Sequence, residues 1–596
     1  MNQKYSVNQY LVSNILSWIQ EGEIAIPEIQ RPFVWETTKI RDLMDSLYKG
    51  FPIGYIIAWK NPDVRLKNGN LSAGKKVLID GQQRLTAMRA AILGENIVDK
   101  NYKEIRVKIA FNPVTEEFAT TTPAITKDNS WISDISLLMK KDGGLFGAVR
   151  DYCEKNLEIE RSQVEASIEK LLEIKNKQVG FIELNSNLDI DTVTEIFIRI
   201  NSKGVILSQA DFAMSKIASN GDFGVNLRKL IDYFCHLSLE PKFYKHIREN
   251  DSEFALTSYL PKIEWLQNQN DDLYDPDYSD VLRVAFAYMF ERGKMGDLVS
   301  LLSGRNFETR SFEYEIVEDS FKKLEEGVID FVNKTHFERF LMIIKSTGFI
   351  HKNLISSQNA LNFAYIVYLK LRKIGMADGE IERYVKRWFV MSILTSRYSG
   401  SAESTFDFDI KNISRIGIEK SLGDIEESEL SDAFWNSRLV QELDKSSISS
   451  PFINVFFASQ VYFNDEGFLS TDITVRNMLD QRGDVHHIFP KAYLMRKYNS
   501  REDYNQIANF VYAQSEINIR VGDKAPSVYL KEMLDQCNGG KVKYGNITNK
   551  ELLNSNLEKH CIPNEILEMD IEQYYPFLEA RRKLMTEKIK RYYQSL

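Results

Sequence analysis

Hydrophobic and polar positions alternate with helical and strand spacing along the first third of the chain. In residues 35–50, Ile40, Leu43, Met44 and Leu47 fall on one face of a helix that Gly50 would end. Similar spacing predicts further helices over 12–24, 85–93 and 191–200, and a helix after the capping sequence 208–211. Runs rich in β-branched and aromatic residues predict strands over 51–60, 75–79, 105–112 and 179–185. This mixture predicts an α/β domain over residues 1–225.

The pattern changes after this region. Residues 226–445 carry mainly helical spacing, with long apolar helices over 363–375 and 381–398. The serine-rich segment LDKSSISSPF, residues 443–452, predicts a linker before a last domain over 446–596. We therefore expect an α+β multidomain protein with an α/β N-terminal domain, a helical coupling region and a C-terminal domain that contains a small sheet among helices.

Composition narrows the class of protein. The 596 residues suffice for about three to five domains. The four cysteines are far apart and form no CxxC, which argues against a zinc ribbon or a disulfide framework. The segment MNQKYSVNQYLVSNILSW lacks the apolar stretch of a signal peptide, and no apolar run reaches the ~20 residues of a membrane span. We expect a cytoplasmic protein with no membrane partner.

The net charge bears on non-specific binding of nucleic acid, whereas the distribution of basic residues bears on local binding. The net charge of −8 argues against a protein that coats nucleic acid, but leaves room for a local basic groove. The most basic piece is RRKLMTEKIKR, residues 581–591, for which a solvated helix face is favoured over a phosphate contact. The polar segment RYSGSAEST, residues 397–405, is interpreted as a loop in preference to a phosphate contact.

The sequence VLIDGQQRLTAM places Asp80 to Arg84 between a predicted strand and a predicted helix. Gly81 permits a tight turn, and the first amides of a helix form a natural phosphate site. Arg84 adds a guanidinium that suits phosphate, and Asp80 suits a metal ion or a sugar hydroxyl. Spacing alone favours the simpler interpretation, a turn with a buried Arg84–Asp80 pair. The chain contains no GxxxxGK[ST] phosphate loop.

Four segments in this region resemble the N-terminal domain of GmrSD-type restriction systems. They are IPEIQRPFVW, RDLMDSLYKGFPIGYIIAW, IDGQQRLTA and FIRINSKGVILSQADF, in the order of the family and within residues 1–220. The resemblance implies a ParB- and sulfiredoxin-like fold that binds and hydrolyses a nucleoside triphosphate such as ATP or GTP. The nucleotide site that it implies consists of Gln30, Arg31, Asp80, Gly81, Gln82, Gln83, Arg84, Asn201, Ser202, Lys203 and Gly204. A plain turn is the alternative for residues 201–204.

A histidine doublet lies in RGDVHHIFPKAYL, in a chain of only seven histidines. Adjacent side chains on a strand point to opposite faces, so His486 and His487 have different surroundings, and Pro490 would end the strand. Asn509 lies 22 positions and Asn518 31 positions after His487, with a helix predicted near 513–519. The alternative is a pair of structural histidines. The remaining five histidines, at 236, 246, 336, 351 and 560, are interpreted as ordinary residues.

The segment 477–530 resembles the HNH nuclease domain of the same GmrSD-type proteins, which has a ββα-metal fold. The resemblance implies that His487 is the general base, that His486 and Asn518 are ligands of a divalent metal, and that Asn509 orients the base. Asp484 would support the metal site. Mg²⁺ or Mn²⁺ suits such oxygen and imidazole donors. A phosphate contact is considered for Lys524, although a salt bridge is favoured.

Together the two resemblances imply an NTP-dependent endonuclease that cleaves modified, foreign double-stranded DNA such as that of phages. A homodimer is also expected from the family. An alternative is a ParB-like, nucleotide-switched DNA-binding regulator in which the HNH fold is vestigial. A third hypothesis is an NTPase that acts on a partner other than DNA.

Overall fold

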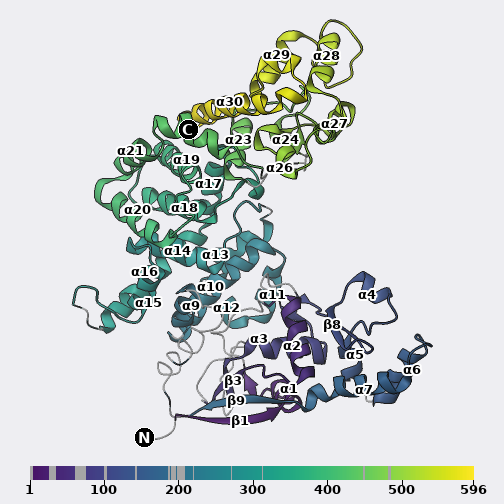
Figure 1. The fold of residues 1–596 in the computed structure, drawn as a ribbon. Coiled ribbons are helices and arrows are strands. Elements are labelled where there is room, and N and C mark those ends of the chain that lie inside the picture. The colour runs from purple at the N-terminus through teal and green to yellow at the C-terminus, as the bar shows by residue number, and fades with distance from the viewer. Residues whose placement is uncertain are drawn as a thin grey trace. The chain divides into compact units, whose positions relative to one another are not determined.

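The computed structural model divides into two compact units, Met1–Val225 and Asn226–Leu596, drawn in Figure 1. The residues that it describes are 4–25, 35–60, 76–98, 104–140, 144–185, 188, 196, 209–218, 220–269, 271–309, 311, 313–446, 450–480 and 485–596. The chain is an α+β protein in which helices predominate and the sheets are small. The further division of the second unit near residue 445 stays a prediction.

The first unit combines short helices with a mixed sheet. Its strands are β1 (Tyr5–Leu11), β2 (Ile24–Ala25), β3 (Tyr55–Lys60), β4 (Lys76–Asp80), β5 (Ile97–Val98), β6 (Glu104–Ile105), β7 (Ile109–Asn112), β8 (Glu117–Thr120) and β9 (Gln178–Leu184). Its helices are α1 (Val12–Gln20), α2 (Thr37–Lys49), α3 (Gln82–Met88), α4 (Pro123–Lys127), α5 (Ile135–Lys140), α6 (Gly144–Cys153), α7 (Arg161–Leu172) and α9 (Gln209–Ala218). A π-helical turn, Arg89–Leu93, extends α3.

Five strands form the main sheet, in the order β1-β9-β3-β4-β2. β9 pairs antiparallel with β1 and parallel with β3, while β4 pairs antiparallel with β3 and parallel with β2. β7 and β8 form a separate antiparallel hairpin. The sheet therefore brings the end of β4, where the DGQQR segment begins, beside β3 at the centre of the unit.

The periodic segments fold in part as their patterns predict. The helix predicted over 12–24 ends at Gln20, and Ile24 lies in the strand β2. α2 buries Ile40, Leu43, Met44 and Leu47 and ends at Gly50, whose φ of 73° is left-handed. The predicted strand over 105–112 is interrupted, because β6 ends at Ile105 and β7 begins at Ile109. Between them the Arg106 guanidinium turns away to donate to the Ala90 carbonyl and the Asp134 carboxylate. The helix predicted over 191–200, apart from residue 196, and the cap at Ser208 lie outside the described residues.

The second unit is mainly helical, as its spacing predicts. The helices before the predicted linker are α10 (Gly221–Leu239), α11 (Phe243–Asn250), α12 (Ser252–Ala255), α13 (Leu260–Ile263), α14 (Tyr278–Phe290), α15 (Met295–Leu302), α16 (Tyr314–Val332), α17 (Lys334–Ser346), α18 (Gln358–Lys373), α19 (Asp378–Leu394), α20 (Ala402–Ile416), α21 (Ile418–Glu429) and α22 (Leu439–Glu442). The later elements are α23 (Pro451–Tyr462), α24 (Val475–Asp480), β10 (Val485–His487), α25 (Lys491–Leu494), α26 (Arg501–Tyr504), β11 (Phe510–Tyr512), α27 (Ser515–Val521), α28 (Pro526–Cys537), α29 (Lys550–Lys559) and α30 (Tyr574–Gln594).

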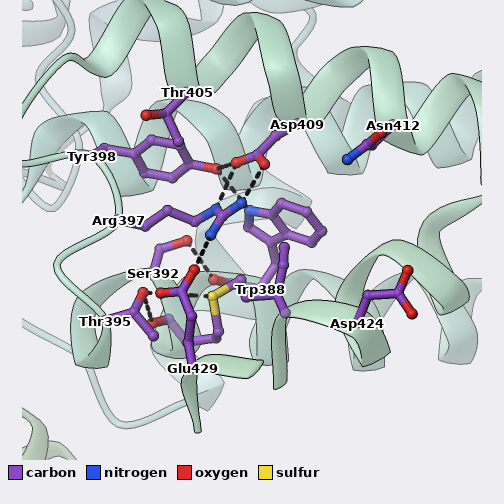
Figure 2. A network of polar contacts seen from close by, with 12 residues as sticks. Trp388, Ser392, Thr395, Arg397, Tyr398, Thr405, Asp409, Asn412, Asp424 and Glu429 are labelled. Carbon is purple, nitrogen blue, oxygen red and sulfur yellow. Dashed lines mark hydrogen bonds and ion pairs between the residues drawn. The ribbon is translucent and has the colours of Figure 1, made fainter. Parts of the chain in front are cut away.

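The segment RYSGSAEST begins inside a buried ion-pair network. Figure 2 shows the Arg397 guanidinium between the carboxylates of Asp409 and Glu429. Two nitrogens of Arg397 donate to the two oxygens of Asp409 at 2.7 and 2.5 Å, and Tyr398 donates to the same carboxylate at 2.9 Å. Trp388 donates to the Tyr398 hydroxyl. These contacts join α19, α20 and α21, and they engage Arg397 in the fold.

The basic segment 581–591 lies on α30, and the expectation of a solvated helix face is wrong for two of its cations. The Arg581 side chain is fully buried, and Lys588 is 4% exposed. Lys588 pairs with the buried carboxylate of Asp465 and donates to the Lys559 carbonyl. The basic composition of this segment therefore does not predict that its side chains are exposed, because tertiary contacts place part of the segment in the core.

Two further findings concern the cysteines and the length of the apolar helices. All four cysteines are free. Within the part of the chain that the structure describes, no helix is both long and apolar enough to cross a membrane.

Candidate functional site

The turn between β4 and α3 holds an ion pair. The Arg84 guanidinium contacts the Asp80 carboxylate at 2.7 Å, and the two side chains are 19% and 23% exposed. A second guanidinium nitrogen of Arg84 donates to the Ile53 carbonyl at 3.1 Å. The Arg84–Asp80 pair that spacing alone favoured is thus present, at the start of a helix and open in part to solvent.

Two glycines make this turn sterically feasible. Gly81 has a φ of 99°, and a side chain there would press against the Ile56 backbone. Gly54 has a φ of 86°, and a Cβ atom there would lie 2.5 Å from the Arg84 guanidinium. Gly54 therefore lets Arg84 approach the backbone next to β3. Sequence analysis did not single out Gly54, although its segment carries part of the family resemblance.

Only part of the predicted nucleotide site can be placed. Asp80 to Arg84 form one continuous group at the end of β4. Gln30, Arg31 and the segment Asn201, Ser202, Lys203 and Gly204 lie outside the described residues. The described residues thus provide the centre of the predicted site, and the other residues stay predictions.

The histidine doublet lies in a short antiparallel hairpin that a helix follows. β10 pairs with β11, with Val485 opposite Tyr512, His486 opposite Val511, and His487 opposite Phe510. Because neighbouring strand residues face opposite sides, His486 and His487 can serve one centre only where a bend or twist at the end of β10 makes their side chains converge. α27, which carries Asn518, follows β11 in sequence. The order strand, strand, helix agrees with the order of a ββα-metal unit.

His487 is held by an asparagine that sequence analysis missed. The distance between Nε2 of its imidazole and Oδ1 of Asn505 is 3.0 Å. Because an amide oxygen only accepts, this contact fits the tautomer that carries its proton on Nε2 and leaves Nδ1 as a base. Burial lowers the pKa of His487, and the contact with Asn505 acts in the opposite direction. The lowered pKa favours the neutral imidazole.

Asn509 binds the main chain on both sides of this hydrogen bond. It is fully buried, its Oδ1 accepts from the Phe489 amide at 2.8 Å, and its Nδ2 donates to the carbonyls of Phe489 and Tyr504. Asn505, and not Asn509, is therefore the asparagine in contact with the imidazole. Asn509 ties the segment after β10 to the end of α26, next to Asn505.

The predicted metal ligands are placed in part. His486 is half-buried on β10 and Asn518 is half-buried on α27, whereas Asp484 lies outside the described residues. In the ranges that the structure describes, no three His, Cys, Asp or Glu side chains gather as a metal cluster.

Lys524 takes part in an ion pair, as the favoured interpretation predicts. Its ammonium group contacts the Glu532 carboxylate at 2.8 Å and the Tyr544 hydroxyl at 3.2 Å. Three donors, with Lys524 the strongest, lower the pKa of Glu532 to about 2. Lys524 thus contributes to the packing of α28.

Comparison with known proteins places the first unit in a family context. Residues 12–218 match the family described as GmrSD restriction endonuclease, N-terminal domain. An uncharacterized protein of Methanocaldococcus jannaschii is 24% identical over 624 aligned positions, which cover 96% of this chain and 96% of that protein. The alignment covers both units, so their combination has a counterpart of similar length. The family match relates the chain, through residues 12–218, to the GmrSD restriction endonucleases.

Proposed function

We propose that the chain is a metal-dependent DNA endonuclease of the restriction type, with its nuclease centre at β10, β11 and α27. The observation that carries the proposal is the His487–Asn505 contact in a strand–strand–helix unit, in a chain whose first part matches a restriction endonuclease family. His487 acts as the general base. Its Nδ1 accepts a proton from the water that attacks the phosphodiester, while Asn505 holds the Nε2 proton.

The residues around His487 fix its direction. Asn505 accepts from the imidazole, and Asn509 holds the backbone segments on which both residues lie. The Phe510 ring packs against the imidazole ring, with 5.0 Å between the ring centroids, and limits its rotation. These contacts reduce the rotation that would otherwise misdirect Nδ1.

His486 and Asn518 would hold a divalent metal, with Asp484 in support. One imidazole and one amide oxygen fit a weakly bound Mg²⁺ or Mn²⁺ ion that shares its remaining positions with phosphate and water. Such an ion, when bound, stabilises the charge that develops on the phosphate oxygens. Asn518 is a neutral ligand, which binds a metal ion more weakly than a carboxylate does, and this supports low affinity for the free ion.

The turn at Asp80 to Arg84 would bind the nucleoside triphosphate of the first unit. Gln82, Gln83 and Arg84 would contact phosphate at the start of α3, together with Gln30, Arg31, Asn201, Lys203 and Gly204. Arg84 is paired with Asp80 in the described state, so a phosphate would share or replace that contact. The proposed substrate is modified, foreign double-stranded DNA, and a homodimer is the proposed assembly.

Replacement of the base tests the proposal directly. Plasmid cleavage is measured on plain and modified DNA, with Mg²⁺ or Mn²⁺, in the presence and absence of a nucleoside triphosphate. His487→Ala should abolish cleavage and leave nucleotide hydrolysis intact, because the two sites lie in different units. His246→Ala, at an exposed histidine, is the matched control and should cut as the wild type does. Cleavage that survives His487→Ala would refute the assignment of the base, and nucleotide-dependent DNA binding without nicking would favour a regulator.

A further inference from the structure

Arg581 is a buried cation that is coordinated by main-chain oxygens. Its side chain is fully buried on α30, and its guanidinium donates to three carbonyl groups. Nη1 donates to Ala508 at 2.8 Å and to Phe510 at 2.9 Å. Nε and Nη2 donate to His560 at 3.2 and 3.1 Å. Arg581 thus binds the main-chain carbonyls of the residues before and after Asn509.

Such a position is costly for a charge. Among the described residues, no carboxylate forms an ion pair with Arg581, and burial lowers its pKa to about 10. Removal of a cation from water without a counter-ion is unfavourable, so burial of the side chain alone does not explain an arginine here. The neighbouring buried cation, Lys588, does have a carboxylate, Asp465. What distinguishes Arg581 is the geometry of its donors.

The planar guanidinium fits a task that other side chains cannot perform. One nitrogen bridges the carbonyls of Ala508 and Phe510, while two others reach His560, which follows α29. A lysine has one nitrogen, which could take the place of Nη1 between Ala508 and Phe510 but could not reach His560 at the same time. The arrangement fixes the Ala508–Asn509 and Phe510–Val511 peptide planes at the point where β11 begins.

From Asn509 the contacts continue to the base. The Asn509 carbonyl accepts from the Ile488 amide at 2.8 Å, and its side chain binds Phe489 and Tyr504. Ile488 follows His487, and Tyr504 precedes Asn505. Arg581 therefore binds the two neighbours of Asn509, and Asn509 binds the main chain next to His487 and next to Asn505.

We propose that Arg581 is a positioning residue of the nuclease centre, which fixes the Ala508–Phe510 segment so that Asn509 can hold His487 and Asn505 in register. This inference rests on the proposed function of His487 as a general base. Arg581 does not touch the substrate, and its effect on cleavage passes through the main chain. The centre is then completed by a helix outside the strand–strand–helix unit.

Two variants of Arg581 test the proposal. Arg581→Gln removes the buried charge without leaving a carboxylate unpaired, and Arg581→Lys keeps the charge but loses the fork. Both should reduce the single-turnover cleavage rate at saturating DNA by about 10- to 100-fold, as loss of an orienting partner does, with the dissociation constant for DNA unchanged. Arg581→Lys should recover at most part of the rate, because one ammonium could meet Ala508 and Phe510 but would lose the anchor on His560.

A control on the same helix separates positioning from stability. Lys588→Met breaks the buried pair with Asp465 and lowers the stability of α30 without touching Ala508 or Phe510. Its cleavage rate per folded molecule should equal that of the wild type. An unchanged rate in the Arg581 variants, or an equal loss in Lys588→Met, would overturn the proposal. Failure of both Arg581 variants to fold, with Lys588→Met folded, would overturn it as well, since Arg581 would then serve the whole unit.

Hydrogen exchange distinguishes failure of this inference from failure of the proposed function. The amides of Ile488 and Phe489 donate to Asn509, so their exchange reports whether Asn509 is held. Exchange in this segment should accelerate in both Arg581 variants and remain at the wild-type rate in Lys588→Met. If the wild type cuts no DNA, the proposed function fails, and exchange still decides whether Arg581 holds the segment. If the Ile488 and Phe489 amides exchange at the wild-type rate in the Arg581 variants, Arg581 does not fix Asn509, and the proposal is overturned.

Discussion

The imidazole of His487 and the amide of Asn505 lie within hydrogen-bond distance, 3.0 Å from Nε2 to Oδ1, although 18 positions separate them in the sequence. His487 lies on β10, and Asn505 follows α26. The contact therefore joins β10 to the segment that connects β10 with β11. It also leaves Nδ1 as the nitrogen that can accept a proton.

The first prediction concerns this contact. Asn505→Ala should lower the cleavage rate by about 10- to 100-fold, because an unheld imidazole samples other rotamers and tautomers. DNA affinity should stay the same, since Asn505 contacts the base and not the substrate. Single-turnover cleavage and DNA binding measure the two effects. Gln506→Ala is the neighbouring control, because that side chain donates to the Glu502 carbonyl instead; a similar loss there would argue against a specific role for Asn505.

The second prediction compares two glycines of the first unit. Gly54→Ala and Gly50→Ala both place a side chain at a left-handed φ, which costs about 1–2 kcal/mol of stability. Only Gly54→Ala also displaces the Arg84 guanidinium, because space is open around Gly50. We expect Gly54→Ala to lose nucleotide binding and Gly50→Ala to retain it. Calorimetric titration with ATP or GTP measures nucleotide affinity, and denaturation measures stability. Equal nucleotide affinity in the two variants would exclude Arg84 from the site.

The third prediction concerns the network in Figure 2. Arg397→Ala should lower the free energy of unfolding by about 3–5 kcal/mol, because the Asp409 carboxylate, which is 1% exposed, loses its counter-ion. Arg339→Ala removes an exposed pair with Asp378 and should cost about 0–1 kcal/mol. Chemical denaturation of the two variants makes the comparison. Similar losses would mean that burial does not control the strength of these pairs.

The fourth prediction is a pH dependence of stability that arises at His560. Burial lowers its pKa from 6.5 to about 3. Its Nε2 lies 2.9 Å from the Glu466 carbonyl and its Nδ1 lies 3.2 Å from the Gln460 amide nitrogen, so a second proton would face another donor. Between these pH values the unfolded chain binds the extra proton and the folded chain does not.

The contribution of His560 is therefore complete above pH 6.5 and falls as the pH decreases, by up to about 1.4 kcal/mol per unit until pH 3. Denaturation of the wild type and of His560→Gln at several pH values isolates this effect, since other titrating groups are common to both. Equal slopes in the two proteins would contradict the assignment.

Local sequence patterns were sufficient to predict elements in which buried residues recur at regular spacing. The apolar face and Gly50 defined α2, and the doublet with its two asparagines indicated the order of β10, β11 and α27. Family resemblance supplied the roles of His486 and His487, which spacing alone could not assign. Those roles stay predictions, as do the residues of the nucleotide site outside the described ranges.

Contacts between distant segments could not be read from the sequence. Nothing near Asn505 distinguishes it from Asn509, because the difference depends on how the segment between β10 and β11 folds back. The basic run on α30 has the composition of an exposed face, yet Arg581 is buried and donates to carbonyls 21, 71 and 73 residues away. Main-chain acceptors have no sequence signature, so such a position becomes visible only in three dimensions.

The separation of Arg581 from Phe510 also has a consequence in time. A ribosome adds the 71 residues between them in about 4–14 s, so each new chain carries a complete β10–β11–α27 segment for seconds before its last support is made. With the proposed role of Arg581, the nascent nuclease would cleave DNA about 10- to 100-fold more slowly during this interval than the finished chain does.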